Sequence, residues 1–135
     1  MTHPVENTRV FFLEHIKRGD IIFVEACSQC GSKATITLEG GLKTPIKLVK
    51  TTGNCDLTRL EGAYSTEKVE EGPVQLKISI DNGSKMKVIK NGTILSDIEG
   101  IEKGIQYVFN IEDHEHLDND FNDYFISVVT WHKKN

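Results

Sequence analysis

The residues of this chain best suited to chemistry are acidic and lie close together near its C-terminal end. Six of its twenty aspartate and glutamate residues fall within the twelve positions 112–123, in the order Glu-Asp-His-Glu-His-Leu-Asp-Asn-Asp-Phe-Asn-Asp. Like charges at this density repel one another and raise each other's pKa unless a cation neutralises them. Carboxylate and amide oxygens are the ligands that calcium prefers. The segment therefore predicts a calcium site in preference to a solvated acidic loop.

The position of the acidic segment favours the same interpretation, because it ends directly against the apolar run 124–131, which we expect to be a core strand. Asp118, Asp120 and Asn122 alternate along the chain, and Asp123 adds a carboxylate from the opposite side. An EF-hand is excluded, because its sixth position must be glycine and is Asp123 here, and its twelfth must be glutamate and is Val129.

The acidic segment resembles the closing segment of a known family, the bacterial calcium-dependent fucose- and mannose-binding lectins of the fucose-binding lectin II type. In that family the segment reads Glu-Asp-Gly-x-Asp-x-Asp-Tyr-Asn-Asp, followed by an apolar strand and a tryptophan. Here Glu112-Asp113 opens the segment, residues 118–123 match its middle, and Trp131 ends the strand. Elsewhere the resemblance rests on strand count, chain length and the loop 26–31.

This resemblance implies two adjacent calcium ions per subunit that bind the sugar directly through its hydroxyls. The metal ligands it implies are Glu112, Asp118, Asp120, Asn122, Asp123, the backbone carbonyl of Cys27 and the terminal carboxylate at Asn135, which would reach a neighbouring subunit. The sugar-binding residues it implies are Ser28, Gln29, Asp118, Asp120, Asn122 and Asp123. Five residues separate Glu112 from Asp118 where the family has three, so Asp113 or Glu115 could take the glutamate's place.

We therefore expect a calcium-dependent carbohydrate-binding protein that recognises fucose- or mannose-type sugars and assembles as a homo-dimer or homo-tetramer. The alternative is a calcium-stabilised structural or adhesion β-sandwich module without sugar binding. A third reading is a metal-assisted hydrolase that uses His114 or His116. We expect no enzyme, because the carboxylates belong to one loop and no G-x-S-x-G nucleophile elbow occurs.

The elements that must position these residues are predicted to be β-strands, because apolar residues recur at a period of two and no helical pattern persists. We expect one domain over residues 1–135, an antiparallel β-sandwich of about eight to nine strands. Asn82-Gly83 and Asn91-Gly92 predict hairpin turns within a meander over residues 74–98. We expect residues 51–72 to be a loop with one weak strand, and Trp131 to fill the core. The predicted strands are 9–13, 21–26, 34–38, 45–49, 74–80, 85–89, 105–111 and 124–131.

Composition excludes several other functions. The net charge is −4 and the basic residues are scattered, so the chain lacks the positive patch that nucleic acids require. No apolar stretch approaches the length of a membrane span, and the first residues lack the apolar region of a signal peptide. We expect synthesis in the cytoplasm, with non-classical release to the cell surface left open. Cys27-Ser28-Gln29-Cys30 spells CxxC, but structural zinc needs four ligands, so loop thiols in a reducing compartment are favoured.

Overall fold

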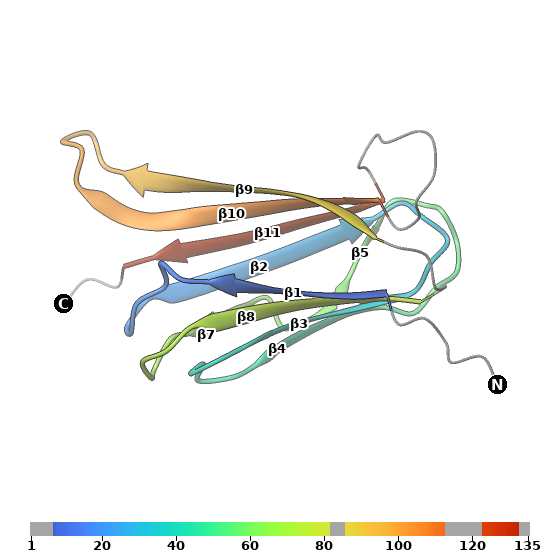
Figure 1. The fold of residues 1–135 in the computed structure, drawn as a ribbon, viewed down its shortest axis with the longest axis horizontal. Coiled ribbons are helices and arrows are strands. Elements are labelled where there is room, and N and C mark those ends of the chain that lie inside the picture. The colour runs from blue at the N-terminus through green and yellow to red at the C-terminus, as the bar shows by residue number, and fades with distance from the viewer. Residues whose placement is uncertain (1–6, 82–85, 113–122, 133–135) are drawn as a thin grey trace.

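The chain folds into two antiparallel β-sheets, as the computed structural model in Figure 1 shows for residues 7–81, 86–112 and 123–132, the part of the chain that it describes. One sheet has the order β1 (Asn7–Leu13), β8 (Val74–Ile80), β3 (Ala34–Glu39), β4 (Ile46–Lys50) and β6 (Glu61–Gly62). The other has the order β5 (Thr58–Arg59), β2 (Ile21–Ser28), β11 (Tyr124–Trp131), β10 (Glu102–Glu112) and β9 (Lys87–Ser96), with β7 (Ser65–Glu67) also paired to β2.

The two sheets share an apolar core, because successive residues of each strand alternate between the interior and the surface. The strand β8 follows this rule along its whole length, with Val74, Leu76 and Ile78 fully buried. These residues belong to the same core cluster as residues of β2, β10 and β11 in the other sheet. The rings of Phe11 and Phe109 meet between the sheets with centroids 5.0 Å apart. The predicted all-β antiparallel sandwich is confirmed.

The predicted meander over residues 74–98 is wrong, because β8 and β9 belong to different sheets. The Asn91-Gly92 dipeptide lies inside β9 and makes no turn. A Cβ at Gly92 would stand 3.3 Å from the ring of Tyr107, so this glycine makes room for an aromatic side chain. The chain reverses instead after Asp97, whose Oδ1 accepts hydrogen bonds from the amides of Ile101 and Glu99. These bonds, that from Ile101 most strongly, hold the pKa of Asp97 below its ordinary value. Asn82-Gly83 lies outside the described residues.

Two further expectations need correction. Residues 51–72 contain three short strands, β5, β6 and β7, where one was predicted. Their two or three residues each are too few to show a period, so only pairing with β2 and β4 reveals them. Trp131 is 44% exposed and not part of the core. The inward positions of β11 are Tyr124, Ile126, Val128 and Thr130, and Trp131 falls out of phase with them.

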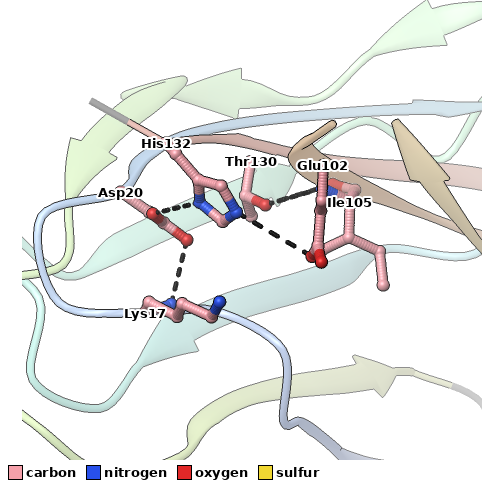
Figure 2. A network of polar contacts seen from close by, with 6 residues as sticks. All are labelled: Lys17, Asp20, Glu102, Ile105, Thr130 and His132. Atoms are coloured by element: carbon pink, nitrogen blue, oxygen red, sulfur yellow. Dashed lines mark hydrogen bonds and ion pairs between the residues drawn. The ribbon is translucent and has the colours of Figure 1, made fainter. Parts of the chain in front are cut away.

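The far end of β11 is anchored by a buried carboxylate, as Figure 2 shows. Asp20, only 2% exposed, accepts a hydrogen bond from the amide of Lys17 at 2.9 Å, and its other oxygen lies 2.7 Å from Nδ1 of His132. The amide of His132 donates to the carbonyl of Lys103 at 2.6 Å. The Nε2 atom of His132 lies 3.8 Å from a carboxylate oxygen of Glu102. This network ties the residue after β11 to the turn before β2 and to the start of β10.

We predict that Asp20→Ala lowers the free energy of unfolding by about 2–4 kcal/mol, because hydrogen bonds to a buried charged group contribute about 1.5–3 kcal/mol each. Urea denaturation at neutral pH measures the change. Asp56→Ala is the matched control at an exposed aspartate and should change stability by less than about 0.5 kcal/mol. Equal stability of the two variants would contradict the anchoring role of Asp20.

Candidate functional site

The two ends of the acidic segment are held side by side by the ladder between β10 and β11. Ile111 pairs with Tyr124, and the amide of Asp123 donates to the carbonyl of Ile111 at 3.0 Å. Glu112 and Asp123 therefore stand at the same end of the six-stranded sheet. The predicted site residues between them, Asp113, Glu115, Asp118, Asp120 and Asn122 together with His114 and His116, lie outside the described residues.

The turn that follows β2 reaches the same end of the sheet, because β2 pairs with the other side of β11. Ser28 lies opposite Tyr124 and Cys27 opposite Phe125. The amide of Gln29 donates to the carbonyl of Asp123 at 3.1 Å. Residues that lie 94 to 98 positions apart in the sequence thus meet at one place. The structure brings together all the predicted site residues that it describes: Cys27, Ser28, Gln29, Glu112 and Asp123.

These five residues differ in what they present to the surface. Gln29 is exposed and Asp123 is half-buried, whereas Glu112 is only 3% exposed. Ser28 is fully buried, and its Oγ accepts a hydrogen bond from the amide of Cys30 at 3.3 Å. Ser28 was predicted to face a bound sugar, but in the structure its side chain is buried. Its hydroxyl shapes the turn, and Gln29 is the residue of this pair that faces outwards.

A buried lysine that the sequence analysis missed holds the loop behind this turn. Lys50, at the end of β4, is 2% exposed. Its ammonium group donates hydrogen bonds to the carbonyls of Cys30, Ser32 and Asn54, the last two at 3.1 and 3.0 Å. The three carbonyl dipoles compensate the charge for its lost hydration. The sequence does contain a signal, because Lys50 is in phase with the inward residues Ile46 and Leu48.

Tyr124 ties the same loop to the central strand of the six-stranded sheet. Its hydroxyl, fully buried with its ring, donates to the carbonyl of Ser32 at 2.7 Å. The loop after β2 is thereby fixed from β4 in one sheet and from β11 in the other. A loop held at both sides can present Gln29 in one defined position, which reduces the ordering entropy that binding would otherwise cost.

The donors at this end of the sheet suit a hard cation. Glu112 and Asp123 offer carboxylate oxygens, and calcium takes several oxygen ligands. Among residues 7–81, 86–112 and 123–132, no three histidine, cysteine or acidic side chains form a group able to hold a metal ion, and the other ligands that the sequence analysis predicts in this segment lie outside these ranges. The thiols are free: Cys30 is buried, Cys27 half-buried and Cys55 exposed.

The same described part of the chain has no helix long and apolar enough to cross a membrane.

We predict that Lys50→Met lowers the free energy of unfolding by about 2–4 kcal/mol, because it removes a buried ammonium group and leaves three carbonyls without that donor. Lys47→Met on the same strand is the matched control, since Lys47 is exposed and its change should stay near zero. Chemical denaturation of both variants measures the difference. A Lys50→Met protein as stable as Lys47→Met would contradict a stabilising role for the hydrogen bonds from Lys50 to the three carbonyls.

Comparison with known proteins gives a clear result for structure and none for sequence. No protein-family model matches the chain, and no curated protein matches its sequence. A high-affinity mannose-binding lectin of Ralstonia solanacearum is similar over 93% of this chain and 96% of its own, with 20% identity and a TM-score of 0.59. The C-terminal domain of a Burkholderia cenocepacia lectin is similar over 96% and 97%, with 15% identity and a TM-score of 0.57. A Chromobacterium violaceum lectin solved with α-methyl-fucoside is similar over 93% and 96%, with 18% identity and a TM-score of 0.55. The chain shares the fold of these bacterial lectins over nearly its whole length.

Proposed function

We propose that this protein is a calcium-dependent lectin that binds fucose- or mannose-type glycans. The observation that carries the proposal is the meeting of Glu112, Asp123 and Gln29 at one end of the six-stranded sheet, with Gln29 and Asp123 joined by a backbone hydrogen bond of 3.1 Å. The fold shared with one lectin whose name includes mannose binding, and with another solved with a fucoside, supports the choice of ligand.

In this proposal the acidic segment and its two flanking strand ends hold calcium. The ligands are Glu112, Asp118, Asp120, Asn122, Asp123 and the carbonyl of Cys27, with Asp113 or Glu115 as alternatives to Glu112. Calcium held by these residues would offer coordination positions to sugar hydroxyls, which are oxygen ligands. The protein's own part is to fix the carboxylates at strand ends. The exposed side chain of Gln29 would offer its amide group to a neighbouring sugar hydroxyl. This is binding chemistry, with no nucleophile or general base assigned.

The direction of β11 supports an oligomer. The strand β11 begins with Tyr124 at the proposed calcium end of the sheet and ends with Trp131, about 23 Å away for eight residues of extended chain. Figure 1 shows these two ends at opposite sides of the sheet. A ligand group that follows Trp131, such as a carboxylate at Asn135, would therefore serve the site of a second copy. A homo-dimer or homo-tetramer with several such sites would also bind clustered glycans more tightly than one site can.

Calcium is predicted to stabilise the folded protein, because it binds the native site and not the unfolded chain. At one hundred times the dissociation constant the gain is about 2.7 kcal/mol. For a protein of this size that corresponds to a melting temperature about 10 °C higher in calcium than in EDTA. Differential scanning calorimetry in calcium, EDTA and magnesium measures it. An equal melting temperature in calcium and in EDTA would contradict both the calcium site and the proposal of a calcium-dependent lectin.

Asp120→Ala is predicted to abolish calcium binding and calcium-dependent sugar binding together, because the family resemblance implies that the Asp120 carboxylate bridges the two calcium ions. Isothermal titration calorimetry with calcium, then with methyl α-L-fucoside and methyl α-D-mannoside, measures both losses. Circular dichroism should show an unchanged β fold, and Asp56→Ala is the control that removes an exposed aspartate elsewhere. Calcium-dependent sugar binding retained by Asp120→Ala would place the calcium site elsewhere. Calcium binding by the unaltered protein without sugar binding would favour the adhesion module.

A further inference from the structure

A hollow on the outer face of the six-stranded sheet lies where the chain crosses from the edge of this sheet to the other one. The strand β5 pairs with β2 at Cys27 and Ser28, and β7 pairs with it at residues 21–23. Between them the chain leaves this sheet and forms β6 against β4 in the other one. A Cβ at Gly62 would stand 2.1 Å from the carbonyl oxygen of Lys47, so glycine is required where the chain makes this crossing. The edge of β2 is therefore covered by short strands at both ends. Between them the crossing chain keeps two backbone hydrogen bonds to β2, from the amide of Val24 to the carbonyl of Tyr64 and from the amide of Leu60 to the carbonyl of Ala26, both at 2.8 Å.

Outward side chains of two neighbouring strands form the floor of this hollow. Phe23 lies opposite Val129, and Glu25 lies opposite Ser127. Arg59 and Tyr64, which flank the crossing, form its wall. The hollow is open to solvent on one side and has a volume of about 190 Å³. At about 30 Å³ per molecule in the liquid, this space corresponds to roughly six water molecules and suits one sugar ring.

The guanidinium group of Arg59 is held in place from two directions. It lies 3.8 Å from the ring centroid of Tyr64, and its Nε is 3.2 Å from a carboxylate oxygen of Glu25. The hydroxyl of Tyr64 in turn donates to the carbonyl of Leu60 at 2.8 Å, which fixes the ring. An arginine ordered in this way loses little side-chain entropy when it binds a ligand. Because Glu25 balances its charge, the hollow favours a neutral ligand over an anion.

We propose that this hollow is a second saccharide subsite that needs no calcium. Phe23, 50% exposed, offers an apolar ring on which the C–H face of a pyranose can pack. Arg59 can donate hydrogen bonds to sugar hydroxyls, and Glu25 can accept them. No residue of the hollow belongs to the calcium site, so the subsite stands on its own residues. Glu25 lies three residues from Ser28 on β2, about 10 Å along the strand, so one glycan can span both sites.

The test is a titration of the 15N-labelled protein, in excess EDTA, with the methyl glycosides of mannose, fucose and glucose. At least one of them should shift the amide signals of Phe23 to Glu25, Tyr64 and Ser127 to Val129. Phe23→Ala should weaken this binding about tenfold, the loss expected for one aromatic contact. Phe12→Ala is the matched control, because Phe12 is 51% exposed on β1 of the other sheet, and should bind as the unaltered protein does.

Arg59→Lys provides a second variant, since it keeps the charge and loses the planar fork that stacks on Tyr64, and it should also weaken binding. The proposal is overturned if no glycoside shifts these signals, if Phe23→Ala and Phe12→Ala bind equally, or if the signals move with protein concentration alone, which would make the hollow a contact between copies. Calcium-dependent binding without EDTA-resistant binding would overturn this subsite and leave the lectin proposal intact. EDTA-resistant binding without any calcium-dependent binding would support this subsite and overturn the proposal of a calcium-dependent lectin.

Discussion

The strand β11 is paired along its full length on both sides, with β2 and with β10, and the placement of every described site residue follows from this pairing. The register is fixed because Tyr124, Ile126 and Val128 are buried, and a slip of one residue would turn all three to the surface. In this register Ser28 is opposite Tyr124, and Tyr124 is opposite Ile111. Burial of apolar side chains in the core therefore decides which polar residues meet at the sheet's end.

Buried lysines stabilise loops at both ends of the sandwich. Lys50 binds three carbonyls beside the candidate site, and Lys68, 1% exposed, donates to the carbonyl of Gly40 at 2.8 Å near the opposite end. Leaving either ammonium group without such acceptors would be costly, so each one constrains the loop that supplies them. The described part of the candidate site is thus built from strand ends and from a loop held by a strand residue. Such a site is more precisely ordered than one on free loops.

The fold could be predicted from the sequence wherever inward residues alternate over five or more positions, and β8 was predicted at its observed bounds, residues 74–80. Prediction failed where a local signal competes with a distant partner. Asn91-Gly92 is typical of a turn, yet Tyr107 covers the glycine from a neighbouring strand. The short strands β5, β6 and β7 exist only through their pairing. For the site, the acidic segment could be recognised by the number of acidic residues in a short stretch. The roles of Lys50 and Ser28 depend on which backbone carbonyls and amides lie near them, and the sequence does not reveal those neighbours.

The central claim is that calcium held at the end of the six-stranded sheet binds sugar hydroxyls. Its most direct test is a glycan array probed with the labelled protein in calcium and again in EDTA. The account predicts selective binding to fucose- or mannose-terminated glycans in calcium, with a loss of most of that signal in EDTA and its recovery when calcium is restored. Binding to the same glycans at equal strength in both buffers, or binding to none of them in calcium, would contradict it.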